Sequence, residues 1–352
     1  MRLALRIIGA LSVAILLIAV AVYVAFAVSP FPAVLLIRHG FDRAAAKASA
    51  ALVPYVPDDI ASELNVRYDA NDPSGYLDVF FPKSAQQTQQ PLTTVVWIHG
   101  GAWVWGNKDQ ISSYARILAH LKFTVVSVDY TIAPEKHYPV PVRQVNAALG
   151  YLARNARGLH VDPARFVLAG DSAGAQIAAQ VANLIAVPSY AAAMSIAPAI
   201  PRKHLVGAIL YCGLYDLNKL DVAGPSGDFW RTVLWAYSGR KDFQSSSAFS
   251  TASVAKYATS TFPSTFISTG NADPLAPQSY EFAIALKREH VRVDSLFFLK
   301  AQTPPLGHEY QFDLDTNAGQ TALRQSAAFL VSLRRIAGVP LRPKERRRRR
   351  AT

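Results

Sequence analysis

Short apolar segments alternate with amphipathic segments over most of the chain after residue 90. The apolar segments are rich in Val, Ile, Phe and Tyr and are bounded by Gly, Asp or Pro, which is typical of buried strands. Six such strands are predicted, at residues 93–99, 124–130, 166–169, 206–211, 265–269 and 294–299. Segments with helical periodicity lie between and after them, at residues 110–121, 142–153, 173–185, 279–289 and 321–336. This alternation predicts right-handed crossovers and an α/β domain built on a mainly parallel sheet.

Two stretches depart from the alternation. Residues 66–69 and 76–81 flank the turn-forming residues 71–75, which predicts a hairpin at the edge of the sheet. Residues 218–261 contain no clear strand and are interpreted as a lid inserted after the fourth parallel strand. The aromatic residues of this lid either line a pocket or pack the lid on the sheet. Because packing is the commoner role, none is taken as a site residue; they are Phe229, Trp230, Trp235 and Tyr237.

The first thirty residues are almost entirely apolar. After Arg2 and Arg6, residues 7–28 form a run of 22 without charge or proline. As a helix this run would be roughly 33 Å long, which matches a hydrocarbon core of about 30 Å. We therefore expect a single-pass membrane anchor at residues 1–30, with the rest of the chain on the non-cytoplasmic side because the two arginines favour a cytoplasmic N-terminus. Secretion after signal cleavage is the alternative, since Ala25-Phe26-Ala27 resembles a cleavage site.

The formal net charge of +12 is concentrated at the C-terminus. Residues 342–350 contain seven basic residues and Glu345, a net of +6, behind Pro340 and Pro343. This composition predicts a disordered basic tail at residues 339–352 that is solvated or touches anionic lipid. The tail has no aromatic residue and no binding motif, so we expect no nucleic-acid partner.

The overall composition predicts a large folded core. The 352 residues are 51% apolar and 17% charged. Cys212 is the only cysteine and lies in an apolar run, so we expect a buried, inert thiol. Residues 31–65 are alanine-rich and interrupted by Pro54 and Pro57, and they are interpreted as a linker and helix without a chemical role. Nothing in the sequence indicates an oligomeric state.

The sequence Gly170-Asp171-Ser172-Ala173-Gly174 joins the third of the six strands to a helix of small residues. A tight strand-to-helix turn holds a serine hydroxyl out of the backbone, where a base can reach its proton and amides can face an oxyanion. The two glycines permit this turn, because a larger side chain would collide with the neighbouring strand or helix. Ser172 is therefore the candidate nucleophile. On this pattern alone, a chance cluster of Gly and Ser is the alternative.

The segment His99-Gly100-Gly101-Ala102-Trp103 lies at the end of the first of the six strands. Its small residues allow the backbone to approach a reacting carbonyl. Amides of this loop and the amide of Ala173 are therefore candidate donors to an oxyanion, worth about 3 kcal/mol each. His99 precedes these amides and is interpreted as a structural residue that holds the loop through a hydrogen bond.

Asp273 and His308 are the candidate partners of Ser172, and each lies in the segment that follows a predicted strand. A carboxylate at position 273 would fix the tautomer of the imidazole, and His308 would act as the general base. Taken singly, a turn-forming aspartate and an exposed loop histidine explain these two residues as well. Asp216 is the alternative acid, because it also follows a strand.

The order Ser172, Asp273 and His308 is the chain order of the triad in α/β hydrolases. The chain resembles the hormone-sensitive-lipase-like branch of that superfamily and related carboxylesterases over residues 66–337. The blocks that carry the resemblance are His99-Gly100-Gly101, Asp129-Tyr130 with Ala133-Pro134-Glu135, Gly170-Asp171-Ser172-Ala173-Gly174, and Asp273-Pro274-Leu275. The resemblance implies an α/β-hydrolase fold with a lid and ester hydrolysis through an acyl-enzyme. It also implies amide donors at Gly101, Ala102 and Ala173, with no cofactor and no metal.

One departure from the resemblance bears on the substrate. Ala102-Trp103 stands where the lipase-like branch usually has a third glycine, and this variant is similar to small-acyl esterases, formamidases and prenylcysteine methylesterases. We expect a serine esterase for a small-molecule ester, with an amidase or formamidase as the alternative. A non-catalytic, membrane-tethered binding protein is the distant alternative, which the complete set of candidate residues disfavours. The catalytic domain is placed at residues 66–338, with the lid at about 218–261.

Overall fold

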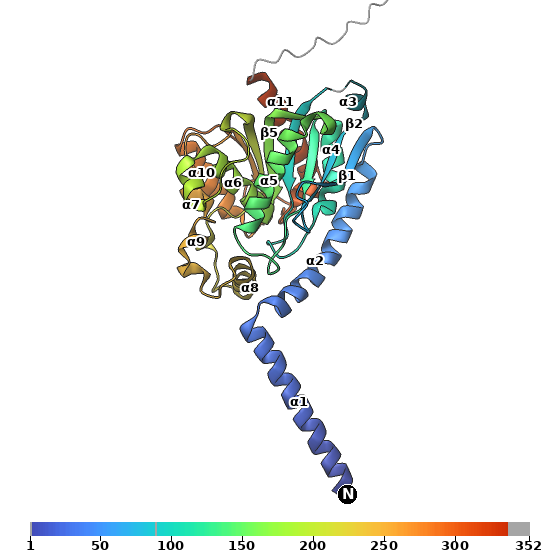
Figure 1. The fold of residues 1–352 in the computed structure, drawn as a ribbon, viewed down its shortest axis with the longest axis vertical. Coiled ribbons are helices and arrows are strands. Elements are labelled where there is room, and N and C mark those ends of the chain that lie inside the picture. The colour runs from blue at the N-terminus through green and yellow to red at the C-terminus, as the bar shows by residue number, and fades with distance from the viewer. Residues whose placement is uncertain (1, 89, 337–352) are drawn as a thin grey trace, which may run out of the picture.

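In the computed structural model, which describes residues 2–88 and 90–336, eight strands form one sheet (Figure 1). Their order in space is β1-β2-β4-β3-β5-β6-β7-β8. The pairs β1-β2 and β2-β4 are antiparallel, and the remaining five pairs are parallel. The predicted edge hairpin and mainly parallel sheet are therefore confirmed. The strands are β1 (Ile60–Arg67), β2 (Tyr76–Pro82), β3 (Leu92–Ile98), β4 (Thr124–Val128), β5 (Val161–Asp171), β6 (Leu205–Tyr211), β7 (Thr265–Thr269) and β8 (Val293–Phe297).

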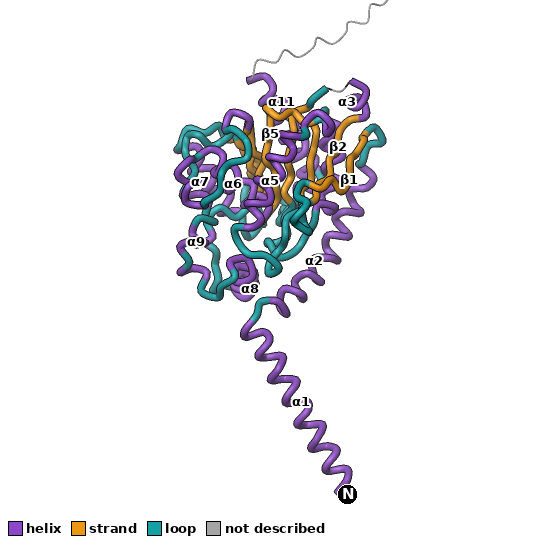
Figure 2. The backbone as a smooth tube through the Cα atoms, viewed as in Figure 1, coloured by secondary structure: helices purple, strands orange, loops and turns teal. Residues whose placement is uncertain are grey.

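Helices cover both faces of the sheet, as the tube in Figure 2 shows. One face packs on α4 (Ser112–His120) and α11 (Asn317–Ile336). The other packs on α5 (Val140–Arg154), α6 (Ser172–Ala186) and α10 (Ala276–Arg288). Along β3, Val96 and Ile98 enter one core, while Val95 and Trp97 enter the other. Successive residues of a strand point to opposite faces of the sheet, and both faces are covered by helices. Most residues of the central strands are therefore buried, which explains their unbroken apolar sequences.

Two helices precede the sheet. α1 (Arg2–Val28) has no buried residue and projects away from the domain (Figure 1). Among residues 2–88 and 90–336, it is the single continuous helix long and apolar enough to cross a membrane, and a signal sequence meets the same criteria. The chain breaks at Ser29-Pro30, and α2 (Phe31–Leu52) then runs along the domain, burying Val34 and Leu52.

The lid segment contains no strand within its described residues. It forms α8 (Gly227–Ser238), α9 (Ser247–Ser250) and short 3-10 turns. Two further short helices, α3 (Lys83–Thr88) and α7 (Pro188–Met194), were not predicted, because neither has enough residues to show a helical period.

Two strands are longer than predicted. β1 begins at Ile60 rather than at residue 66, because several positions of this edge strand are exposed and polar residues interrupt the expected alternation. β5 begins at Val161 rather than at residue 166, and a register shift between Phe166 and Val167 interrupts its pairing with β6. The predicted basic tail, at residues 339–352, lies outside the described residues.

Candidate active site

A strained turn places Ser172 at the junction of β5 and α6. β5 ends at Asp171, and Ser172 is the first residue of α6 with a φ of 51°. A Cβ on Gly174 would lie 2.1 Å from the carbonyl oxygen of Ile98 in β3, and a Cβ on Gly170 would lie 2.6 Å from the carbonyl carbon of Gly174. Both contacts are with backbone that cannot yield easily. Glycine at the two flanking positions is therefore what allows this turn, for the steric reason that the sequence predicts.

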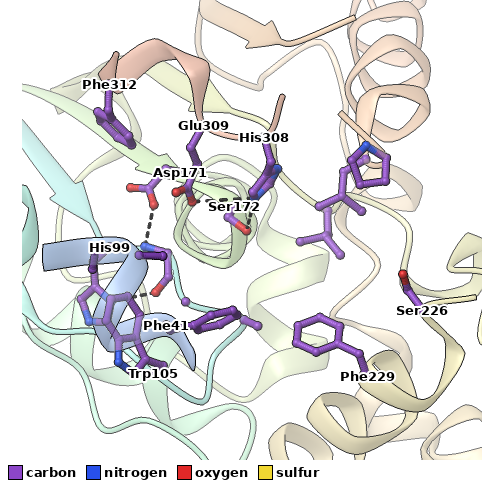
Figure 3. A pocket seen from close by; sticks show the side chains of 18 of the residues that line it. Phe41, His99, Trp105, Asp171, Ser172, Ser226, Phe229, His308, Glu309 and Phe312 are labelled. Atoms are coloured by element: carbon purple, nitrogen blue, oxygen red, sulfur yellow. Dashed lines mark hydrogen bonds and ion pairs between the residues drawn. The ribbon is translucent and has the colours of Figure 1, made fainter. Parts of the chain in front are cut away.

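Ser172, His308 and Asp273 form a continuous chain of hydrogen bonds (Figure 3 shows the first two). Nε2 of His308 lies 3.0 Å from Oγ of Ser172, and Nδ1 of His308 lies 3.0 Å from Oδ2 of Asp273. The Asp273 side chain is fully buried and also accepts hydrogen bonds from the hydroxyl of Thr269 and the amide of Leu275. A carboxylate held in this way orients the imidazole so that Nε2 faces the serine hydroxyl.

The alternative acid is not brought to the histidine. Asp216 caps a short 3-10 turn, and its carboxylate accepts hydrogen bonds from the backbone and side-chain amides of Asn218. The carboxylate at position 273 therefore contacts the imidazole, and the one at position 216 does not.

Glu309 is a second acidic neighbour of the imidazole that the sequence analysis did not single out. Its Oε1 lies 3.7 Å from Nε2 of His308, and its backbone has a φ of 59°. Burial of the His308 ring favours its neutral form, but the hydrogen bond to Asp273 and the nearby charge of Glu309 act in the opposite direction, and the pKa of His308 is raised above its usual value. The position next to the candidate base was the only signal in the sequence that pointed to Glu309.

The loop after β3 has an unusual backbone beside the serine. Gly101, Ala102 and Trp103 all have positive φ, at 100°, 52° and 61°. A Cβ on Gly101 would lie 2.1 Å from the carbonyl oxygen of Trp105. The Trp103 indole N–H donates to Gln176 over 3.1 Å, and its ring stacks on Tyr237 of α8. This loop therefore has a defined shape, held by α6 and α8, next to the expected amide donors at positions 101, 102 and 173.

Asp171 connects this loop to the strand-to-helix turn. Its buried carboxylate accepts hydrogen bonds from the indole N–H of Trp97 over 2.7 Å and from the amide of Gly100 over 2.8 Å. Burial, together with the nearby carboxylate of Glu309, raises the pKa of Asp171 well above its usual value. The residue before the candidate nucleophile thus holds the start of the loop after β3 in place.

His99 has the contacts of a structural residue. Its ring stacks on Tyr130 with centroids 4.2 Å apart, and its Nδ1 lies 2.8 Å from the carbonyl oxygen of Gly100. Burial lowers the pKa of His99 to about 4. The ring is therefore neutral near pH 7, and Nδ1 acts as the donor to this carbonyl.

The donor atoms of Cys212, Asp273 and His308 lie within 4.8 Å of one another, which raises the question of a metal site. A metal would need a thiolate, but burial raises the pKa of the Cys212 thiol to about 11. The Asp273 carboxylate and Nδ1 of the histidine are also already engaged with each other. Asp273 and His308 therefore fit a hydrogen-bonded pair better than a metal centre.

A cavity of about 910 Å³ opens beside Ser172 and His308 (Figure 3). One wall is a single face of α2, formed by Phe41, Ala44, Ala45, Ala48, Ser49 and Leu52. The sequence predicts a linker and helix without a chemical role at residues 31–65; the structure has this helix and adds that one of its faces lines the cavity. The sequence could not reveal the role, because an alanine-rich helical face has the same pattern wherever it packs.

The lid contributes the facing part of the cavity. Phe229 and Trp230 of α8 line it, whereas Tyr237 is buried against Trp103 of the loop after β3. The ring of Phe229 lies 6.3 Å from that of Phe41, so α8 and α2 meet at this point. Two of the four lid aromatics thus line the cavity although none was taken as a site residue.

Comparisons with known proteins agree with this fold. A family model described as alpha/beta hydrolase fold matches residues 95–302. The carboxylesterase NlhH of Mycobacterium tuberculosis is 37% identical over 133 residues, which are 36% of this chain and 41% of that protein. Esterase B of Lactobacillus rhamnosis aligns with a TM-score of 0.75 at 21% identity, over 87% of this chain and 98% of that one. An esterase of Pyrobaculum calidifontis aligns with a TM-score of 0.67 at 22% identity, over 90% and 97% of the two chains.

Proposed function

This chain belongs to the alpha/beta hydrolase fold family, and we propose that it hydrolyses carboxylic esters through an acyl-enzyme formed on Ser172. The observation that supports the proposal most directly is the pair of 3.0 Å contacts that His308 makes with the serine hydroxyl and with Asp273. The stretch shared with a carboxylesterase supports ester hydrolysis over other reactions of this fold.

The first half of the reaction acylates the serine. His308 takes the proton of the Ser172 hydroxyl while its oxygen attacks the ester carbonyl carbon. The backbone amides of Gly101, Ala102 and Ala173 stabilise the resulting oxyanion. The bond to the alcohol then breaks, and the protonated imidazole returns its proton to the leaving oxygen. Asp273 stabilises the imidazolium in between and stays ionised.

The second half releases the acid. His308 removes a proton from water, whose oxygen attacks the acyl carbon, and the same amides hold the second oxyanion. Collapse of this intermediate breaks the bond to Ser172, which regains its proton from the imidazolium. The substrate is a small-molecule ester, and none of these steps calls on a cofactor.

The proposal is tested with the full chain in detergent micelles. Wild-type protein should hydrolyse p-nitrophenyl acetate and react with a fluorophosphonate probe. Ser172→Ala should lose labelling and about 10⁶ in kcat, as expected when a serine nucleophile is removed. Ser279→Ala makes the same change at another buried serine, on α10, and should leave both readouts unchanged. An esterase rate close to wild type in Ser172→Ala would refute the proposal, and matched p-nitroanilides would reveal an amidase instead.

We also propose that α1 anchors the domain in a membrane and that the domain lies on the non-cytoplasmic side. The 27-residue helix has no buried position and carries no charge after Arg6, which supports an anchor, and Arg2 and Arg6 at its start support this orientation. In spheroplasts, added protease should degrade the domain without lysis. Protection from the protease would refute the orientation, and release of the whole domain into the medium would indicate a cleaved signal.

A further inference from the structure

Apolar side chains are exposed on α2 immediately after its junction with α1. Phe31, Leu35 and Leu36 are 41%, 49% and 67% exposed, although the same helix buries Val34 completely. The helix is therefore packed on the domain, and these three residues form its solvent-facing side. A group of large, exposed apolar side chains indicates a surface that binds another protein or a membrane.

The end of α8 adds an aromatic residue and a cation at the same junction. Lys241 lies over the ring of Trp235, with Nζ 4.5 Å from the ring centroid. The same ammonium group donates a hydrogen bond to the carbonyl oxygen of Ala27, in the last turn of α1. Tryptophan and lysine at the end of an apolar helix are typical of the lipid-water interface. We refer to Phe31, Leu35, Leu36, Trp235 and Lys241 as the collar (α1, α2 and α8 in Figure 1).

The collar lies close to the cavity. Phe41, the first residue of α2 to line the cavity, follows Phe31 by ten residues, a rise of about 15 Å along a helix. An acyl chain that spans one leaflet of a bilayer has about the same length, half of a hydrocarbon core of about 30 Å. At the end of the cavity nearest the collar along α2 the lining is apolar, because Phe41 contacts Phe229 of α8 and Trp105.

We propose that the collar docks the domain on the bilayer and that the cavity receives the acyl chain of a long-chain ester dissolved in that leaflet. The occupant of the collar is lipid because the surface is continuous with α1, which buries nothing in the protein. An uncharged ester suits the apolar faces of α2 and α8. This inference rests on the proposed ester hydrolysis and on the proposed membrane anchor, and it adds the substrate class and its route to the site.

The first test compares two esters with the full chain reconstituted in phosphatidylcholine vesicles. Leu35→Asp combined with Leu36→Asp should lower the hydrolysis of vesicle-borne p-nitrophenyl palmitate by about tenfold or more, because charged residues do not enter the interface. The hydrolysis of soluble p-nitrophenyl acetate should not change. Leu64→Asp places the same charge on β1, at a residue that is 55% exposed, and should change neither rate. A wild-type palmitate rate in the double variant would overturn the inference.

A second measurement does not depend on activity. Leu35→Cys labelled with bimane should be quenched by lipids with brominated acyl chains, and Leu64→Cys should not. The native Cys212 is buried and should not react with the label. Equal quenching at the two positions, or none at position 35, would overturn the docking even in an active enzyme. If the wild-type protein does not hydrolyse p-nitrophenyl acetate, the proposed function is refuted. The quenching measurement then tests membrane docking by itself.

Discussion

Arg38 of α2 donates a hydrogen bond from Nε to the backbone carbonyl of Val104 over 2.7 Å. The same guanidinium donates to the carbonyl of Ala133 over 2.9 Å and forms two hydrogen bonds with Glu135, over 2.7 and 2.6 Å. It therefore ties α2 to the loop that carries the proposed oxyanion donors. A further contact, from the indole N–H of Trp105 to Asp42, joins the same helix and loop over 2.8 Å.

This contact predicts that Arg38 positions the loop without touching substrate. Arg38→Ala leaves two backbone carbonyls without their donor, and we expect kcat for p-nitrophenyl acetate to fall about tenfold with little change in KM, because small misplacements of a site are costly. Arg38→Lys should restore part of the lost kcat, since a lysine ammonium group can replace only some of the hydrogen bonds made by the planar guanidinium. Arg43→Ala, an exposed arginine on the same helix, is the control. An equal loss in kcat for the two alanine variants would contradict the positioning role.

The identity of the acid predicts a large difference between two aspartates. Asp273→Asn should lower kcat by about 10³ to 10⁴, because the amide no longer favours the tautomer that presents Nε2 to the serine. Asp216→Asn should have a minor effect, because its carboxylate only caps a turn next to Asn218. Steady-state kinetics on a soluble ester decide between them. A larger loss at position 216 would reverse the assignment.

The carboxylate of Glu309 predicts a shift in the pH profile. It is one of the neighbours that raise the pKa of His308, which must be neutral to act as a base. The acid limb of kcat/KM should therefore lie well above the usual histidine range, and activity should rise as the pH rises through it. Glu309→Gln removes a negative charge that stabilises the imidazolium, so the limb should move to lower pH. An acid limb that stays at the same pH or moves to higher pH in Glu309→Gln would contradict this role of Glu309.

The close packing of the turn at Ser172 predicts that a larger side chain at Gly174 destabilises the protein. A Cβ on Gly174 would lie 2.1 Å from the carbonyl oxygen of Ile98 and 2.5 Å from that of His99, and backbone on both sides prevents relief. Gly174→Ala should lower the free energy of unfolding by about 1–3 kcal/mol and should also lower activity. Gly158→Ala has nothing within 4 Å of the new Cβ and serves as the control. Urea unfolding followed by circular dichroism measures both variants, and equal stability would contradict the steric explanation.

Local patterns in the sequence were sufficient to predict the sheet, the crossover helices and the turn around Ser172. These features depend on residues that are near one another in the chain, such as an apolar run followed by Gly170 and Gly174. Chain order then pointed to Asp273 and His308 as partners, and the structure brings them together although 136 positions separate the histidine from the serine. Their catalytic roles remain proposals that the variants above test.

Only the tertiary structure decided which surfaces surround these three residues. α2 carries no chemical signal of its own, and it forms a wall of the cavity through long-range contacts such as that of Arg38 with Glu135, 97 positions away. Phe229 and Trp230 line the cavity, whereas Tyr237 of the same helix stacks on Trp103. This difference depends on the orientation of α8 relative to α2. Such choices follow from long-range packing of elements whose apolar faces look alike in sequence. Local pattern and chain order therefore indicated the candidate residues, and packing determined the shape of the cavity.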